Sequence, residues 1–300
     1  MGIPEEQLQR WSNQGATITP KMVRERIERA LRGNLSIIRN KNNLQIFLQG
    51  SYRNNTNIFG NSDVDIVVQS NDTYFYDITY LTEYEDTAFQ QAFIPASYTW
   101  SQFKNEVLKT LENEFGSSNI TVGNKSIKLL INGFEADVVP SFQFRSYKKF
   151  GNYEPTTQYE EGIILFTTQD EKRVINYPKL HIKNGSMKNE SAIQNFKPFV
   201  RVFKNLRNKL ISNGKITKEM APSYFIENLL YNVPSYCFHS NTYEQRAYNV
   251  LSWLDKNRFE MGGFTCQNEK VLLIGESQEQ WRSINALNTI DEAIILWNEW

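Results

Sequence analysis

The sequence has very few of the residues that build zinc sites, disulfide frameworks and histidine-based catalytic centres. Its 300 residues include only two cysteines, Cys237 and Cys266, and only two histidines, His181 and His239. Neither cysteine belongs to a CxxC pair, and the histidines are not at a spacing that suits metal ligands. We therefore expect two reduced core thiols, and neither a zinc site nor a Ser-His-Asp triad.

Long apolar runs and net charge are also absent. No stretch approaches the roughly 18 apolar residues of a transmembrane helix, and the N-terminus lacks the basic start and apolar run of a signal peptide. We therefore expect a cytoplasmic protein without a membrane partner. The chain carries 33 basic and 33 acidic residues. Because binding to long nucleic acid depends on neutralising many phosphates, we expect no such partner, whereas small anionic ligands need only a few local positive groups.

The pattern of elements changes past the middle of the chain. Apolar residues make up 40% of it, enough for one large domain or two closely joined ones. The first part predicts helices over 20–40 and 99–115 and strands over 44–51, 62–69, 119–122, 125–131, 134–140, 142–148, 162–168 and 172–176. From about Lys188 the pattern predicts helices alone, over 195–213, 222–230, 241–256 and 277–298. The aromatic segment 72–98 has no clear pattern, and YPKLHIKNG at 177–185 is typical of a surface loop.

Specific residues support four of these elements. Asn132-Gly133 stands between two apolar runs and is the strongest short signal for a hairpin, so 125–131 should pair with 134–140. In two predicted helices, apolar residues recur on one face. These residues are Val23, Ile27, Leu31 and Leu35 in the first, and Phe199, Val202, Phe203, Leu206 and Leu210 in the second.

The first residues that suggest chemistry are Asp63 and Asp65, one residue apart on the predicted strand 62–69. Side chains at positions i and i+2 of a strand point to the same face. Apolar neighbours indicate that the opposite face is buried. Two adjacent carboxylates repel each other, and no Lys or Arg in the segment compensates them. A divalent cation is the natural counter-charge, and oxygen ligands select Mg²⁺ or Mn²⁺.

A third carboxylate occurs in the later strand GFEADVVPSF, at Asp137. Glu135 lies two residues earlier, so it would share the face of Asp137 and is the alternative third ligand. We favour Asp137 because its flanking sequence, ADVVP, is the more apolar.

A possible anion site precedes the acid pair. The predicted strand 44–51 ends in Gly50-Ser51, twelve residues before Asp63. A strand that ends in such a turn offers free backbone N–H groups and a hydroxyl at one point, which can bind an anion. The turn is close enough in sequence to hold a phosphate beside a metal.

This ordered set resembles a known active-site signature. The segment QGSYRNNTNIFGNSDVDIVV is similar to the GS…DxD signature of the DNA polymerase β-like nucleotidyltransferase superfamily. Within it, Thr56, the run Ser62 to Ile66 and the third acid in ADVVP most resemble the bacterial cyclic-oligonucleotide synthases related to animal cyclic GMP–AMP synthase, the cGAS/DncV-like nucleotidyltransferases. The resemblance implies an α+β fold: a polymerase β-like core, with a mixed β-sheet and flanking helices, joined to a C-terminal helical bundle. It implies a catalytic core at 1–185 and a helical domain at 186–300 that closes the nucleotide cleft.

The second half carries further matches to the same family. FVRVFKNLRNKL places Lys204 at the family's lysine position, and APSYFIENLLYNVP places Ser223 and Tyr224 at its Ser-Tyr position. By resemblance, Lys204 and Ser223 contact phosphate, Tyr224 stacks on a base, and Gln49 also touches the nucleotide. Taken alone, Lys204 could belong to a solvated basic face and Tyr224 could simply pack in the core.

The resemblance also implies a reaction. Asp63, Asp65 and Asp137 would hold two Mg²⁺ or Mn²⁺ ions, and Gly50 and Ser51 would bind the nucleotide. Ribonucleoside triphosphates would be joined into a cyclic di- or trinucleotide that signals phage infection to a downstream effector protein. The alternative is a template-independent nucleotidyltransferase that acts on RNA, protein or a small molecule. A nucleotide sensor with a degenerate site is disfavoured, because all three acids and the Gly-Ser pair are present.

Overall fold

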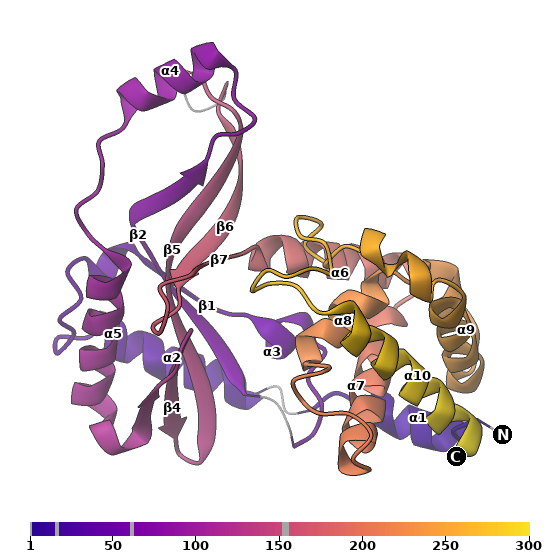
Figure 1. The fold of residues 1–300 in the computed structure, drawn as a ribbon. Helices are drawn as coiled ribbons and strands as arrows, with labels where there is room; N and C mark the ends of the chain where they lie inside the picture. Colours follow the sequence, from indigo (N-terminus) through magenta and orange to yellow (C-terminus); the bar gives the residue numbers. More distant parts are fainter. Residues whose placement is uncertain (1, 16–17, 61–62, 152–155) are drawn as a thin grey trace. The chain divides into compact units, whose positions relative to one another are not determined.

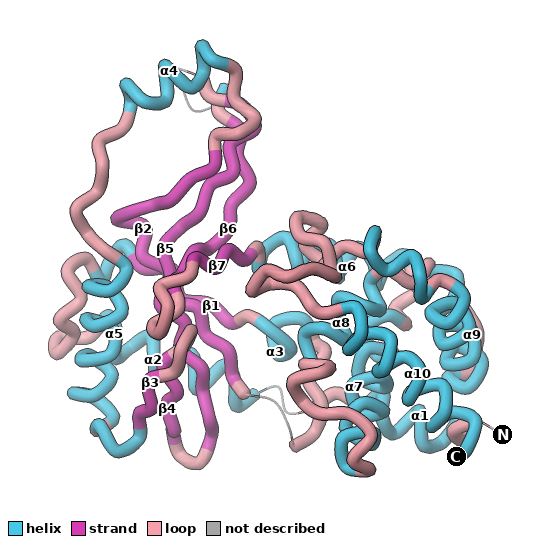
Figure 2. Tube along the Cα trace, in the orientation of Figure 1, coloured by secondary structure: helices cyan, strands magenta, loops and turns pink. Residues whose placement is uncertain are grey.

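The computed structural model describes residues 2–15, 18–60, 63–151 and 156–300. The chain divides into two compact units. We call Ile18–Gln49 with Asp63–Lys179 the sheet unit, and Met1–Thr17 with Gly50–Ser62 and Leu180–Trp300 the helical unit. Figure 2 shows that the strands gather in the first and helices dominate the second. Residue Ser62 of the acidic motif lies outside the described residues.

The two units do not follow one cut of the sequence, because the helical unit also contains the N-terminal residues and the segment from Gly50 to Ser62. The predicted domains 1–185 and 186–300 would meet inside helix α6 (Pro178–Ser191). That boundary stays a prediction.

The described strands of the sheet unit form one mixed sheet. They are β1 (Leu44–Leu48), β2 (Val64–Asp77), β3 (Ile120–Val122), β4 (Ile127–Ile131), β5 (Phe134–Lys149), β6 (Gln158–Phe166) and β7 (Arg173–Asn176). Their order is β1-β2-β5-β4-β3, and β6 pairs with both β5 and β7. β2 and β5 run parallel to each other, and the other pairs are antiparallel. The predicted mixed sheet is therefore present.

β5 is one long strand, although two strands, 134–140 and 142–148, were expected around Pro140. Proline has no N–H to donate, so it is tolerated only where a strand lacks a partner on one side. β5 pairs with β4 as far as Val138 and with β6 from Phe142 onwards. Pro140 falls at this change of partner, where its missing N–H breaks no ladder.

The Asn132-Gly133 hairpin is confirmed. Ile131 pairs with Phe134, and the two turn residues have φ of 51° and 83°. These values are typical of the type I′ turn, in which both central residues are left-handed.

Gly133→Ala should lower the free energy of unfolding by about 1–2 kcal/mol, because a side chain disfavours the left-handed backbone at this position. Chemical denaturation would measure the loss. Gly262→Ala is the matched control, since a Cβ there meets open space and its φ is not left-handed. Equal stability of the two variants would contradict the turn assignment.

Helices α2 (Ile18–Arg32), α4 (Glu83–Ala92) and α5 (Trp100–Phe115) belong to the sheet unit. The helix expected over 20–40 is shorter than predicted: Val23, Ile27 and Leu31 are buried, but Leu35 is 67% exposed. α2 ends before Gly33-Asn34, two poor helix formers. There the Arg32 guanidinium donates to the carbonyl oxygens of Lys41 and Leu44, both at 2.8 Å, and directs the chain into β1.

Packing of α5 distinguishes the two faces of the sheet. Its Phe103 ring stacks on Phe142 of β5 at 5.5 Å between centroids, and Trp100 Nε1 donates to the carbonyl oxygen of Pro140 at 2.9 Å. Because side chains alternate along a strand, residues at even positions of this part of β5 face α5, and odd positions face away.

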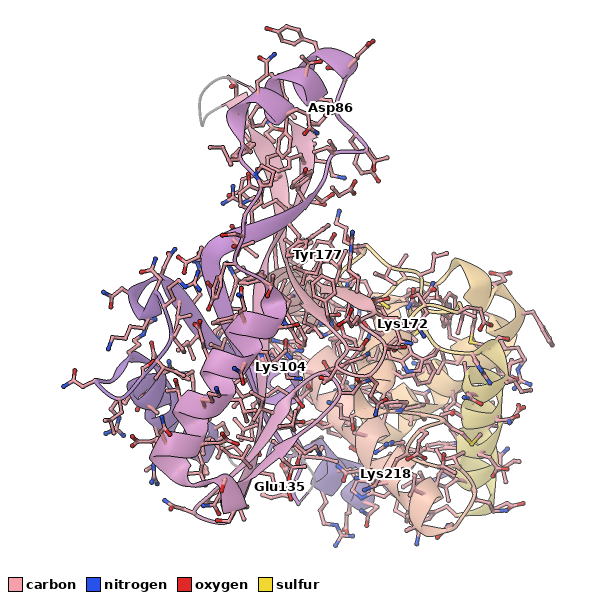
Figure 3. The ribbon with its side chains drawn as sticks, turned by 60° about the vertical axis from the view of Figure 1, so that its left-hand side comes forward. Asp86, Lys104, Glu135, Lys172, Tyr177 and Lys218 are labelled. Carbon is pink, nitrogen blue, oxygen red and sulfur yellow. The ribbon has the colours of Figure 1, made fainter. Side chains whose placement is uncertain are left out.

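The unassigned segment 72–98 continues β2 and then forms α4. Figure 3 marks Asp86 on α4 and Lys104 on α5. Residues of segment 72–98, of α5, of the end of β6 and of the loop after it line a cavity of about 1060 Å³. Aromatic side chains form part of its walls, with Tyr74, Phe93, Tyr98, Trp100 and Phe166 among them. The three predicted catalytic acids do not line it.

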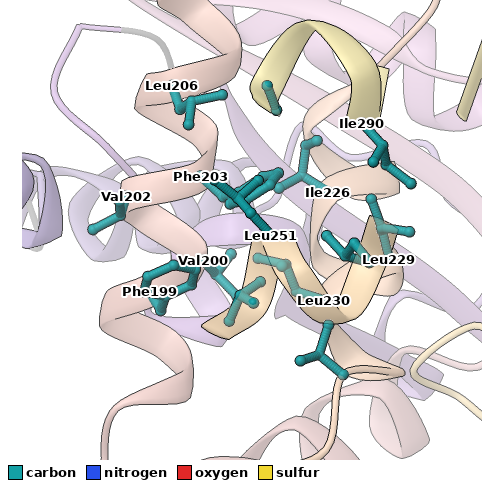
Figure 4. Close-up of a cluster of buried hydrophobic side chains, with 14 of the residues drawn as sticks. Phe199, Val200, Val202, Phe203, Leu206, Ile226, Leu229, Leu230, Leu251 and Ile290 are labelled. Atoms are coloured by element: carbon teal, nitrogen blue, oxygen red, sulfur yellow. The ribbon is translucent and has the colours of Figure 1, made fainter. Parts of the chain in front are cut away.

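The helical unit is built around α7 (Phe196–Ser212). Around it are α1 (Glu5–Ser12), α3 (Gly50–Asn54), α8 (Ser223–Tyr231), α9 (Tyr243–Lys256), α10 (Ser283–Glu299) and most of α6. All five residues of the predicted apolar face of α7 are buried, and Figure 4 shows several of them beside Ile226, Leu229 and Ile290. Within the described ranges, no helix is long and apolar enough to span a membrane.

Helix α6 corrects the expected surface loop at 177–185. Pro178 begins the helix, a position that suits proline, and His181 is buried. Gly185 weakens the helical pattern in the sequence, but the Gln267 side chain occupies the place that a Cβ would take there. Glycine at this position therefore leaves room for the Gln267 side chain to pack against α6.

Candidate active site

The register of the two parallel strands brings the predicted acids onto one face of the sheet. Asp65 of β2 is the direct partner of Asp137 on β5. Asp63 precedes β2 by one residue and is exposed, whereas Asp65 and Asp137 are half-buried. Val64, Ile66, Ala136 and Val138 are buried on the opposite face. The sheet thus presents adjacent carboxylates at the end where β2 begins.

Glu135, the alternative third acid, lies near the start of β5, where Figure 3 labels it. Its side chain is exposed, and its partner on β4 is Leu130. Asp137 is aligned with Asp65, and its Oδ1 accepts a hydrogen bond of 3.1 Å from Ser126 Oγ. This alignment supports Asp137 over Glu135.

The oxygen-only donor set fits a hard divalent cation such as Mg²⁺ or Mn²⁺. Over the part of the chain that the structure describes, no three Asp, Glu, His or Cys side chains already converge on one metal position. Mutual repulsion disfavours such convergence of carboxylates without a cation between them. The backbone register therefore supports a metal site at this face.

Lys128 is a neighbour that the sequence reasoning missed. The hairpin register places it on β4 directly opposite Asp137, and its side chain is exposed. Partners across an antiparallel pair share a face, so Lys128 and the carboxylate of Asp137 lie on the same face of the sheet. The Asn132-Gly133 signal could have predicted this pairing. In a hairpin with a two-residue turn at 132–133, residue 128 stands opposite residue 137.

The predicted nucleotide-binding residues begin where β1 ends. The Gln49 N–H donates to the carbonyl oxygen of Asp65 at 2.9 Å, which ties this end of β1 to the acid pair. The next residue, Gly50, has a φ of 64° and begins the short helix α3. The Ser51 carbonyl oxygen accepts a hydrogen bond of 2.9 Å from the Thr56 N–H, which links the start of α3 to the residue two positions past its end.

Lys204 is buried rather than part of a solvated basic face. Its side chain is only 2% exposed. Its ammonium group forms an ion pair with Glu227 and donates to the carbonyl oxygen and hydroxyl of Thr56, both at 3.2 Å. Three acceptors match the three hydrogens of an ammonium group.

Glu227 is the centre of this network, and sequence reasoning did not identify it. Its carboxylate accepts hydrogen bonds from the Thr56 hydroxyl at 2.6 Å and the Asn54 amide at 3.1 Å, and it contacts His181 Nε2 at 3.3 Å. Burial raises the pKa of Glu227, but Lys204 and His181 outweigh it and hold the pKa well below its ordinary value. Glu227 is therefore a fully charged buried group at neutral pH.

Ser223 and Tyr224 open α8, directly after Pro222. The Tyr224 side chain is 38% exposed, while the following Phe225 is fully buried. The Tyr224 hydroxyl lies 3.3 Å from His181 Nδ1, and the two rings are 5.0 Å apart. Tyr224 is thus held in one orientation with part of its ring open to solvent.

Comparison with known proteins agrees with this geometry. Residues 31–169 match the nucleotidyltransferase domain, and residues 183–298 match the cGAS/DncV-like nucleotidyltransferase C-terminal helical domain. The chain is 51% identical to cyclic nucleotide synthase CdnE01 of Staphylococcus haemolyticus over the full length of both. It is 38% identical to the cyclic UMP-AMP synthase of Rhodothermus marinus, over all of this chain and 99% of that one.

Solved structures show the same similarity. The R. marinus CdnE c-UMP-AMP synthase with Apcpp and Upnpp has a TM-score of 0.85 and 38% identity, covering 99% of this chain and 97% of that one. The Elizabethkingia meningoseptica CdnE cyclic dinucleotide synthase with GTP and Apcpp has a TM-score of 0.78 and 30% identity, covering 99% and 98%.

The chain belongs to the cGAS/DncV-like nucleotidyltransferases. The predicted fold, a nucleotidyltransferase core with a helical domain, is confirmed. So is the predicted enzyme class, a nucleotidyltransferase that makes cyclic oligonucleotides.

Proposed function

We propose that this enzyme joins two ribonucleoside triphosphates into a cyclic dinucleotide, with Asp63, Asp65 and Asp137 as its metal ligands. The alignment of Asp65 with Asp137 on parallel strands is the observation that carries the assignment of the acids. Adenosine and uridine triphosphates are the first substrates to consider. The support is the R. marinus relative, whose name specifies a cyclic UMP-AMP product.

In the proposed reaction, a ribose hydroxyl oxygen of one nucleotide attacks the α-phosphorus of the other. A P–O bond forms, the bond to pyrophosphate breaks, and the hydroxyl proton is lost to solvent. A second, equivalent attack within the linear intermediate closes the ring and releases a second pyrophosphate. Two divalent ions, when bound, would lower the charge of the triphosphate and the pKa of the attacking hydroxyl. The three aspartates would hold these ions.

The other predicted residues have binding roles in this proposal. Gly50 and Ser51 would bind phosphate through backbone N–H groups and the serine hydroxyl, and Gln49 would touch the same nucleotide. Ser223 would contact phosphate, and the partly open ring of Tyr224 would stack on a base. Lys204 stays a candidate phosphate contact, although its ammonium group already has three acceptors.

We further propose that the product acts on a downstream effector protein in antiphage defence in the cytoplasm, without long nucleic acid or membrane as partners. The net charge of zero supports the absence of long nucleic acid. The competing function is transfer to RNA, protein or a small-molecule acceptor.

We expect the purified protein, given all four ribonucleoside triphosphates and Mg²⁺ or Mn²⁺, to form a small product that resists phosphatase. A cyclic product has no terminal phosphate for the phosphatase to remove. Mass spectrometry would give its base content and ring size, and reactions with pairs of triphosphates would test the adenosine-uridine preference. If the nucleotides were instead found only in polymer or attached to an added acceptor, the result would contradict the proposal and favour the competing function.

A further inference from the structure

We propose that Glu227 is a positioning residue for nucleotide binding, which fixes both the Gly50-Ser51 turn and the Tyr224 side chain on the helical unit. This inference rests on the proposed function, because it assumes that the turn and Tyr224 contact a nucleotide. Glu227 itself is 3% exposed, so it acts through other residues rather than on the substrate.

The first arm of the network holds the chain immediately after the Gly-Ser turn. Three consecutive residues are fixed: Asn54 donates its amide to Glu227, Arg201 binds the Asn55 carbonyl oxygen at 2.5 Å, and Thr56 donates its hydroxyl to Glu227. Asn55 has a left-handed φ of 58°, a conformation that asparagine tolerates better than most residues. Because the segment is held at every residue, it has little freedom to shift.

Thr56 connects this anchor to the phosphate-binding turn. Its side chain contacts Glu227 and Lys204, and its backbone N–H donates to the Ser51 carbonyl oxygen. One residue thus bonds the buried carboxylate on one side and the predicted phosphate contact on the other. A displacement of Thr56 should be transmitted directly to Ser51.

The second arm holds Tyr224. His181 Nε2 lies 3.3 Å from Glu227, and His181 Nδ1 lies 3.3 Å from the Tyr224 hydroxyl. A carboxylate can only accept, so His181 donates from Nε2, and its Nδ1 bonds the tyrosine hydroxyl. The chain Tyr224–His181–Glu227 therefore orients the ring predicted to stack on a base.

Lys204 supplies the charge that this arrangement needs. An isolated carboxylate is very unfavourable in a buried site, and Lys204 neutralises it while donating to Thr56. The same lysine was predicted from family resemblance to contact phosphate. The two roles differ in their consequences: a direct ligand acts independently of Glu227, whereas a positioning residue acts only as part of the pair.

The matched variants Thr56→Val and Thr56→Ser test the first arm, because valine keeps the shape of threonine without the hydroxyl and serine keeps the hydroxyl. We expect Thr56→Val to raise KM for the triphosphates about tenfold with a smaller change in kcat. Thr56→Ser should restore a KM near that of the wild type. Thermal melts of both variants would show that each is folded at the assay temperature.

A double-mutant cycle on Lys204→Met and Glu227→Gln tests the pair, with KM as the readout. Positioning predicts that each single variant raises KM and that the double variant is no worse than either. The inference would be overturned if Glu227→Gln alone left KM unchanged and Lys204→Met raised KM equally with and without Glu227→Gln. That result would show that Lys204 binds phosphate directly.

The wild-type enzyme is assayed in parallel, so that failure of the proposed function can be distinguished from failure of the positioning role. A wild type that forms no cyclic product overturns the proposed function. An active wild type together with a Thr56→Val variant of unchanged KM overturns the positioning role alone.

Discussion

Asp65→Asn and Asp137→Asn should each lower the rate of nucleotidyl transfer by about a thousandfold, which corresponds to roughly 4 kcal/mol of lost transition-state stabilisation. Each change replaces a carboxylate, which we propose to be a metal ligand, by a neutral amide of nearly the same shape. The two positions are partners across parallel strands, so each loss should impair the same metal site. Initial rates of pyrophosphate release with Mg²⁺ and Mn²⁺ would measure the effect.

Glu135→Gln is the control for this prediction. Glu135 is exposed and lies two residues from Asp137 on the same strand. Its replacement by glutamine removes one negative charge, as the two aspartate variants do. We expect its rate to stay within about threefold of the wild type, as for other exposed charges. Thermal melting temperatures of all three variants should stay close to that of the wild type, because the replaced side chains are exposed or half-buried and each amide keeps the shape of the acid. An inactive Glu135→Gln with an active Asp137→Asn would reverse our choice of third ligand.

Glu227→Gln should lower the free energy of unfolding by about 3–5 kcal/mol at pH 7, because it leaves the buried ammonium group of Lys204 without its counter-charge. The effect should depend on pH. The pKa of Glu227 is lower in the folded protein than its ordinary value of 4.5. Its contribution is therefore fully present above about pH 4.5 and is lost as the pH falls below that value. Urea denaturation of both proteins from pH 7 down to about pH 2.5 would show the difference narrowing below pH 4.5.

Glu161→Gln is the matched control for the buried pair. Glu161 forms an ion pair with Lys179 at 2.6 Å, but 27% of the glutamate side chain and 49% of the lysine side chain are exposed. Such pairs contribute at most about 1 kcal/mol. A Glu227→Gln variant no less stable than Glu161→Gln would contradict a charged, structurally important Glu227.

The acids could be predicted from the sequence because their signal is local. Asp63 and Asp65 lie one residue apart at the start of one strand, and the apolar pattern that follows them defines the face of the carboxylates. That Asp137 is aligned with Asp65 could not be predicted, because the register of parallel strands depends on how the sheet assembles. The position of Lys128 was predictable from the hairpin, whose turn sets the pairing of the strands that it joins.

The network around Glu227 could not be predicted in the same way. Its partners Asn54 and Thr56 lie more than 170 residues away in sequence, and His181 lies in a helix that the sequence did not indicate. One signal was present: Glu227 is the only acidic residue in the apolar run SYFIENLLY, where a charge requires a partner. That signal identifies a buried acid but not its partners.

The ratio of pyrophosphate released to cyclic product formed is the measurement that tests the central claim most directly. Closing a ring of two nucleotides forms two phosphodiester bonds, and each bond releases one pyrophosphate. We therefore predict two pyrophosphates for each phosphatase-resistant dinucleotide, with both products formed about a thousandfold more slowly by Asp65→Asn. Pyrophosphate released without a cyclic product, or a cyclic product that Asp65→Asn still forms at the wild-type rate, would contradict the account.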